Sequence, residues 1–212
     1  EGYREVLGFK LADSETESGW GEFFSELRER GLTSVDLITS DDHRGLVKAI
    51  RRHFQGASWQ RCQTHFSRNV LERAPKKCQP DLKQDLNRIY NAKDEEDARR
   101  LLKETVESYG EKAPASVKIL EEGFEDIMAV MSLPQKYRRK LRTSNGIERL
   151  NEEIRRRDRV IRIYPNEESV IRLIGALLVE HDERWSTGKK YMDMQEYYDG
   201  LGEKKTVVGA AA

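Results

Sequence analysis

Two short predicted strands, each leading directly into a helical segment, constrain the fold of this chain more than any other feature. The first is the apolar run Val35–Ile38, which ends in Thr-Ser-Asp-Asp and is followed by a predicted helix over residues 43–53. The second, residues 57–62, is followed by a helix that starts near Gln63. Strands that alternate with helices in this way predict an α/β core in which helices cover a sheet.

Two more elements are expected before these strands. Residues 5–11 are predicted to form a strand, because apolar side chains stand there among few polar ones. The apolar residues at positions 20, 23, 24 and 27 recur at helical spacing, and Gly31 is placed to end the helix that they predict.

Residues 80–135 differ in character, because charged residues alternate with leucines at helical spacing and no strand pattern occurs. We expect helices there and two more near the carboxyl end of the chain, at 81–90, 94–109, 115–131, 145–157 and 166–184. The pattern therefore predicts an α/β core made of two segments, a helical insertion between these segments, and a disordered tail. Their ranges are 1–79 and 136–198 for the core, 80–135 for the insertion and 199–212 for the tail.

The composition excludes several classes of protein. Charged residues make up 36% of the 212 residues, and the longest apolar run, near Ile171–Val179, is too short for the roughly 20 residues that cross a bilayer. Nothing resembles a signal peptide, and two cysteines cannot form a disulfide framework. We therefore expect a cytoplasmic protein without a membrane segment.

A net charge of zero conceals a strong asymmetry. Residues 1–30 carry eight acidic and four basic side chains, whereas residues 136–162 carry eleven basic and four acidic ones. The basic window is typical of a surface that binds a polyanion. Two solvated basic helices would explain the same charges equally well.

Asp41 is the first candidate for a chemical role, because it follows a buried strand, where open α/β sheets place their ligands. A carboxylate at that point could bind a metal ion. Alternatively, Asp41 or Asp42 could cap the helix that starts near His43, and position alone favours the cap. Both roles are compatible if Asp42 caps the helix while Asp41 points across the edge of the sheet.

Glu148 is the second candidate. Asn145 followed three residues later by Glu148 resembles a capping box, in which the glutamate only returns a hydrogen bond to the cap. Against this, Glu148 and Arg155 lie together beside the apolar stripe of the same helix. An acidic residue next to arginines suits a site in which a carboxylate binds a metal ion and the arginines contact phosphates. The stripe, which we expect to be buried, consists of Ile147, Leu150 and Ile154.

Cys62 and His65 form a C-x-x-H unit after the last predicted strand. A closed zinc site needs four ligands, and the remaining cysteine and histidines form no matching pair, so a packed cysteine with a hydrogen-bonded histidine is favoured. The sequence also lacks a phosphate-binding loop, a dinucleotide-binding glycine pattern, a serine nucleophile elbow and an H-E-x-x-H unit. Nucleotide hydrolysis, dinucleotide redox chemistry and serine hydrolysis therefore lose support.

Five stretches in this order resemble the mutator-type transposases of bacterial insertion sequences, and the similarity continues to about Tyr198. The stretches are GYREVLG (2–8), SDDHRGL (40–46), WQRCQTHFSRN (59–69), TSNGIERLNEEIRRR (143–157) and RLIGA (172–176), the last followed by YM (191–192).

The resemblance implies a ribonuclease H-like core with an Asp, Asp, Glu triad and a helical insertion between the second Asp and the Glu. Asp41 matches the second Asp, Glu148 matches the Glu, and residues 80–135 match the insertion. Cys62 and His65 match the C-x-x-H signature of the family, for which we assign no role.

In such a site, three carboxylates hold two Mg²⁺ or Mn²⁺ ions, one activating a water or a 3′ hydroxyl and the other stabilising the leaving oxygen. The first Asp of the triad belongs on an opening strand upstream of Glu1, and neither Asp13 nor Asp36 is placed to replace it. We therefore expect that this chain is a fragment that binds metal weakly and cleaves little or no DNA.

The resemblance also implies DNA as the partner, both transposon ends and target, with self-association and action at the nucleoid. Four arginines of the basic window are expected to contact phosphates: Arg142, Arg149, Arg155 and Arg156.

Two other classes of function remain open. The chain could be a DNA-binding remnant that has lost catalysis, or a helical interaction module in which Asp41 and Glu148 are only caps. A different ribonuclease H-like nuclease, such as a resolvase, is disfavoured by the C-x-x-H unit and by the stretch 145–157.

Overall fold

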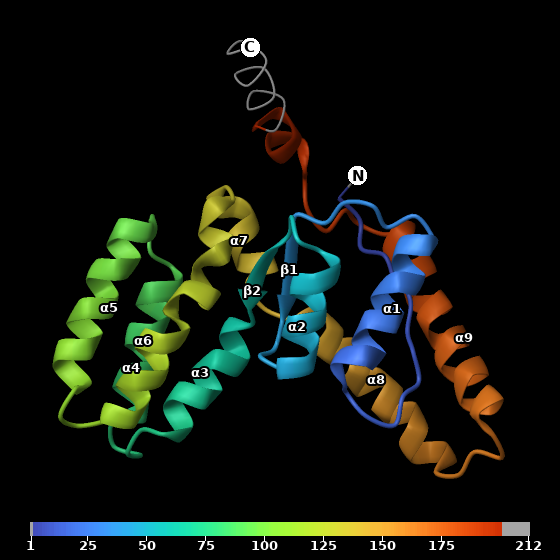
Figure 1. Cartoon of the computed structure of the whole chain (residues 1–212), viewed down its shortest axis with the longest axis horizontal. Coiled ribbons are helices and arrows are strands. Elements are labelled where there is room, and N and C mark those ends of the chain that lie inside the picture. Colours follow the sequence, from blue (N-terminus) through green and yellow to red (C-terminus); the bar gives the residue numbers. More distant parts are fainter. Residues whose placement is uncertain (1, 201–212) are drawn as a thin grey trace. The chain divides into compact units, whose positions relative to one another are not determined.

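The computed structural model describes residues 2–200 (Figure 1). The expected disordered tail lies, from residue 201 onward, outside the described residues. The chain forms two compact units. The central unit is Ser14–Asn145, and the terminal unit combines the residues up to Asp13 with those from Gly146 onward.

The central unit begins with a small α/β part. Its elements are α1 (Glu17–Glu29), β1 (Leu37–Ser40), α2 (Arg44–His53) and β2 (Ser58–Arg61). The two strands pair in parallel, with Leu37 opposite Ser58 and Ser40 opposite Arg61, as the predicted order of strand, helix and strand requires. α1 packs on α2 through Phe24 and other apolar side chains, which confirms the predicted stripe of α1.

A helical part completes the central unit. It comprises α3 (Gln63–Glu72), α4 (Gln79–Tyr90), α5 (Glu95–Tyr109), α6 (Pro114–Met128), the 3-10 helix η1 (Ala129–Ser132) and α7 (Gln135–Leu141). The apolar side chains of α3 to α6 share one core, in which Phe66, Leu120 and Ile127 are completely buried. These helices confirm the helical pattern of residues 80–135. The short helix α7 is not among the predicted elements.

Gln60 joins the sheet to the helical part. Its side chain is completely buried, its Nε2 donates to the carbonyl oxygen of Ile127 at 2.9 Å, and its Oε1 accepts from the N–H of Val130 at 2.8 Å. The Nε2 of Gln63 donates to the same Ile127 oxygen at 3.0 Å. These bonds satisfy backbone groups at the end of α6 that would otherwise be buried without partners.

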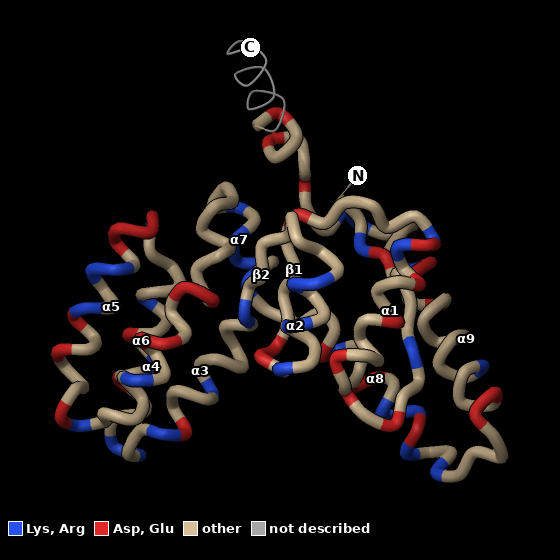
Figure 2. Tube along the Cα trace, in the orientation of Figure 1, with Lys and Arg blue, Asp and Glu red and all other residues tan. Residues whose placement is uncertain are grey.

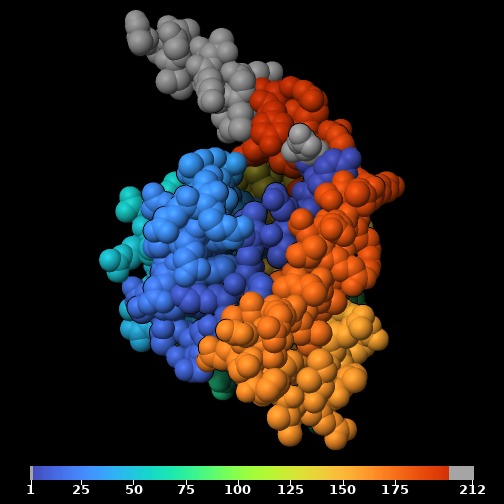
Figure 3. Space-filling model, turned by 90° about the vertical axis from the view of Figure 1, so that its right-hand side faces the viewer, coloured from blue at the N-terminus to red at the C-terminus, as the bar shows by residue number. Residues whose placement is uncertain are grey.

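The terminal unit contains α9 (Glu167–Ser186) and α8 (Asn145–Ile161), apart from the first residue of α8. Residues 2–12 run along α9 (Figure 3). They form no strand in the described structure, so the prediction of a strand over 5–11 is wrong. The N–H of Val6 donates to Oδ1 of Asp182 at 2.7 Å, and the guanidinium of Arg4 lies 4.2 Å from the ring of Trp185. A strand needs a neighbouring strand, and here α9 side chains take that place.

The predicted buried stripe of α8 is also wrong, because none of its described residues is buried and Ile147 is 65% exposed. Together, the two-stranded sheet and the helical majority place the described chain in the mixed α/β class. No helix in the described part of the chain is long and apolar enough to cross a membrane.

Candidate functional site

The carboxyl ends of β1 and β2 meet at one edge of the parallel sheet. Asp41 follows β1 directly and Cys62 follows β2 directly. The N–H of Cys62 donates to the carbonyl oxygen of Ser40 at 2.7 Å, so both residues leave the sheet at the same edge. In open α/β sheets this edge is where ligands bind.

The side chain of Asp41 is exposed at this edge. Within residues 2–200, its carboxylate forms no ion pair, whereas Oδ2 of the neighbouring Asp42 lies 3.0 Å from Nη1 of Arg61. The N-cap of α2 is His43, and no side chain provides a cap hydrogen bond there. The alternative in which Asp41 or Asp42 caps this helix is therefore wrong.

The segment before α8 is bound to the same edge by the backbone of Leu141 and Arg142. Oγ1 of Thr39, in β1, donates to the carbonyl oxygen of Leu141 at 2.5 Å. The N–H of Gln63, the first residue of α3, donates to the carbonyl oxygen of Arg142 at 3.0 Å. Because the two donors come from different elements of the edge, they fix both the position and the direction of the segment.

Cys62 holds the next residues of this segment. Its side chain is completely buried, and its Sγ accepts from the N–H of Ser144 at 3.4 Å and from the Ser144 hydroxyl at 3.2 Å. In the first turn of α3, Oγ1 of Thr64 donates to Oδ1 of Asn145 at 3.2 Å. The start of α8 is therefore anchored within the central unit, at the edge that carries Asp41.

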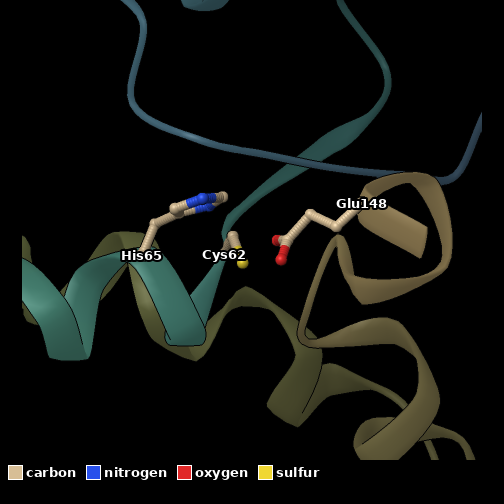
Figure 4. A group of neighbouring side chains, drawn as sticks. All are labelled: Cys62, His65 and Glu148. Atoms are coloured by element: carbon tan, nitrogen blue, oxygen red, sulfur yellow. The ribbon is translucent and has the colours of Figure 1, made fainter. Parts of the chain in front are cut away.

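Figure 4 draws the side chains of the C-x-x-H unit together with Glu148. Cys62 lies between β2 and α3, His65 lies in the first turn of α3, and Glu148 lies in the first turn of α8. Cys62 and His65 are part of the central unit, and Glu148 is part of the terminal unit. The burial and hydrogen bonds of Cys62 are those of a packed cysteine.

Arg142 lies at the end of α7, half-buried. Its Nη1 donates to the carbonyl oxygen of Tyr90 at 2.9 Å and to Oδ1 of Asn91 at 3.0 Å. Burial, followed by the charge of Arg139, lowers the pKa of its guanidinium. Both effects disfavour a cation that lacks an anionic partner.

The other three predicted phosphate-binding arginines are exposed on α8. Within residues 2–200, Arg149 and Arg155 form no ion pair. Arg156 forms an ion pair with Glu153, with 2.6 Å between Nη2 of Arg156 and Oε1 of Glu153. The hydrogen bond from Arg156 lowers the pKa of Glu153 to about 2. Arg149 and Arg155 are therefore better placed to take a new anion than Arg156.

Two further cations were missed by sequence reasoning. Arg142 lines a groove of the central unit, and Arg68 of α3 and Lys83 of α4 line this groove too. More than fifty residues of sequence separate either residue from Arg142. No local pattern of sequence could reveal this neighbourhood, since it results from the packing of α3 on α4.

Comparison with known proteins adds to this geometry. The sequence model of the family described as "Transposase, Mutator family" matches residues 1–188. The chain is similar to the transposase for insertion sequence element ISRM5 of Rhizobium meliloti (strain 1021), with 39% identity over 92% of this chain and 49% of the relative.

Two more relatives show the same relationship. The transposase for IS1081 of Mycobacterium tuberculosis is 38% identical, with 92% of this chain and 47% of the relative covered. The transposase for IS256 in transposon Tn4001 of Staphylococcus aureus is 40% identical, with 92% and 51% covered. The chain thus spans about half the length of these curated relatives.

Proposed function

Because this chain belongs to the mutator family of transposases, we propose that it carries part of the catalytic site for metal-dependent DNA cleavage and strand transfer of an insertion sequence. The observation that carries the proposal is the edge of the parallel sheet, where Asp41 leaves β1 and where the segment before α8 is bound. We further propose a ribonuclease H-like core, made of residues 1–79 and 136–198, with residues 80–135 as its helical insertion.

Chain connectivity relates Glu148 to this edge. Glu148 follows Asn145 by three residues in the same helix, and an α-helix rises about 1.5 Å per residue, so about one turn separates them. Asn145 is itself bound to Thr64 in the central unit. This supports the proposal that Glu148 and Asp41 serve one site.

The donor set fits a hard divalent cation. Asp41 and Glu148 offer carboxylate oxygens, the ligands that Mg²⁺ and Mn²⁺ prefer, and Asp41 is not neutralised by any described cation. Zn²⁺, by contrast, favours nitrogen and sulfur ligands, and the Sγ of Cys62 is buried and already accepts two hydrogen bonds.

Each group then has a defined task. Two bound Mg²⁺ or Mn²⁺ ions would supply activation of the attacking hydroxyl and stabilisation of the leaving oxygen in phosphoryl transfer. Asp41 and Glu148 would contribute carboxylate oxygens to hold these ions. Cys62 positions the chain that leads to Glu148 through its bonds to Ser144.

DNA is the proposed partner, with transposon ends and target both bound through phosphates. The proposed contacts come from Arg142, Arg149, Arg155 and Arg156, and they supply affinity rather than sequence readout. Self-association on paired ends is part of the same proposal, since the relatives are transposases of insertion sequences.

Calorimetric titration with Mn²⁺ tests this function. We expect weak binding by the unaltered chain and its loss in Asp41→Asn and in Glu148→Gln, with unchanged circular dichroism. Glu152→Gln is the matched control, because Glu152 is an exposed carboxylate of the same helix. If both candidate variants bind Mn²⁺ as the unaltered chain does, the metal-site proposal is wrong. DNA binding by a folded chain that binds no Mn²⁺ would instead favour a DNA-binding remnant.

A further inference from the structure

A polar groove of about 560 Å³ lies within the central unit, between α3, α4 and the segment that leads from α7 to Asn145. Four cationic side chains line it, and Glu72 is the one carboxylate among the lining residues described. The four are Arg68, Lys83, Arg139 and Arg142.

The charges of this groove are not neutralised. Within residues 2–200, Arg68, Lys83 and Arg139 form no ion pair with a carboxylate. Elsewhere in the helical part arginines are paired: Nη1 of Arg88 lies 2.9 Å from a carboxylate oxygen of α4, and Nη1 of Arg99 lies 2.8 Å from one of α6. Figure 2 shows that Lys and Arg alternate with Asp and Glu along α5. The groove therefore concentrates positive charge in a part of the protein that otherwise balances it.

Arg142 is fixed at the wall of the groove by its bonds to Tyr90 and Asn91. The Tyr90 hydroxyl is in turn 2.7 Å from the hydroxyl of Ser67, in α3. A half-buried arginine beside a second arginine, both at a polar groove, is the arrangement expected for an anion site.

We propose that this groove binds the sugar–phosphate backbone of DNA, and that the helical insertion therefore takes part in holding DNA through Lys83. The proposal rests on the proposed transposase function and extends it to residues that the family match does not assign. Arg68, Lys83, Arg139 and Arg142 each contact phosphate oxygens.

The other lining groups favour backbone contacts over base readout. Thr64 and Asn87 present hydroxyl and amide groups, which commonly bind phosphate and sugar oxygens. Among the described residues that line the groove, Tyr90 is the only aromatic one. Its side chain is buried and is therefore not available to stack on a base. The groove also reaches Asn145, so the bound strand passes the start of the helix that carries Glu148.

Fluorescence anisotropy with a labelled DNA duplex in EDTA tests the inference, over a series of salt concentrations. The variant is Arg68→Gln with Lys83→Gln. Its matched control is Lys103→Gln with Lys118→Gln, which removes two exposed lysines of α5 and α6 that lie outside the groove. Circular dichroism checks that every variant is folded.

We expect the groove variant to bind DNA more weakly and to make the negative slope of log K against log salt shallower by about 2, since each phosphate contact contributes about −0.9 to that slope. The control keeps the slope of the unaltered chain. A folded groove variant with unaltered affinity and slope, or a chain that binds no DNA, would overturn the inference. Because EDTA removes divalent metal ions from the assay, the result does not depend on whether Asp41 and Glu148 bind Mn²⁺. The groove proposal and the metal-site proposal can therefore fail separately.

Discussion

Replacing Gln60 by Leu tests the joint between the sheet and the helical part. The Gln60 side chain is completely buried, and its Oε1 is the acceptor for the N–H of Val130, a residue that is 1% exposed. Leucine has a similar size but no polar atom. The substitution therefore removes the acceptor without opening a large cavity.

The magnitude follows from the groups that lose partners. A buried donor left without an acceptor costs about 1 to 3 kcal/mol. The carbonyl oxygen of Ile127 keeps the hydrogen bond from Gln63, at 3.0 Å, and so adds little to this cost. The carbonyl oxygen of Arg61 also loses a bond from Gln60 Nε2, of 2.8 Å, but this bond is only partly buried. We expect a loss of about 2 kcal/mol of unfolding free energy, which lowers Tm by about 4 to 8 °C in a chain of this length.

Urea unfolding measures this loss. In a Trp185→Phe background, tryptophan fluorescence reports on the central unit alone, because Trp20 and Trp59 both lie there. Gln55→Leu is the control, since Gln55 is exposed and its replacement is expected to stay within about 0.5 kcal/mol. A Gln60→Leu variant as stable as this control would refute the reasoning.

Three further predictions concern packing, capping and pH. In Gly123→Ala the new Cβ would overlap the ring of Phe66. Overpacking of about 1 to 3 kcal/mol should therefore outweigh a helix-propensity gain of about 1 kcal/mol, and a rise in Tm would contradict this. Asn166→Ala removes the N-cap of α9 and should cost about 1 kcal/mol in urea unfolding, whereas no change would show that the cap contributes nothing. The hydrogen bond from Arg156 lowers the pKa of Glu153 to about 2 from 4.5, so the contribution of Glu153 to stability is present above pH 4.5 and is lost as the pH falls towards 2. A carboxyl NMR titration with its midpoint near 4.5 would disprove that last prediction.

Sequence periodicity predicts the helices well where one apolar face is buried. The expected helix 94–109 is observed as Glu95–Tyr109, because leucines at helical spacing reach the core of the helical part. Helix α7 was not predicted, since its seven residues include four basic ones and only Tyr137 is buried. A helix with one anchoring side chain has no stripe to detect.

Two sequence predictions fail because they depend on distant partners. The strand expected over 5–11 has apolar residues in a suitable run, but the N–H of Val6 is bound by Asp182, which lies at the other end of the sequence. The stripe of α8 has the right spacing, yet Ile147 is exposed in the structure. Periodicity indicates which side chains share a face, but it does not show what covers that face.

The candidate site was only partly predictable. The position of Asp41 followed from the end of an apolar run, and the structure removes the capping alternative, since α2 begins at His43 without a side-chain cap. The bonds from Ser144 to Cys62 join residues 82 positions apart, and no sequence pattern encodes them. For the same reason the groove cations Arg68 and Lys83 emerge only from the packed structure.

The most direct test of the central proposal is the paramagnetic broadening of backbone NMR signals by Mn²⁺, which detects weak binding and locates it. We expect the amide signals of Asp41, Cys62 and Glu148 to broaden together, and Glu148→Gln to abolish the broadening at all three. The Glu152→Gln control should leave it unchanged. Broadening at Asp41 that persists in Glu148→Gln, or no broadening near either carboxylate, would contradict a shared metal site at the edge of the sheet.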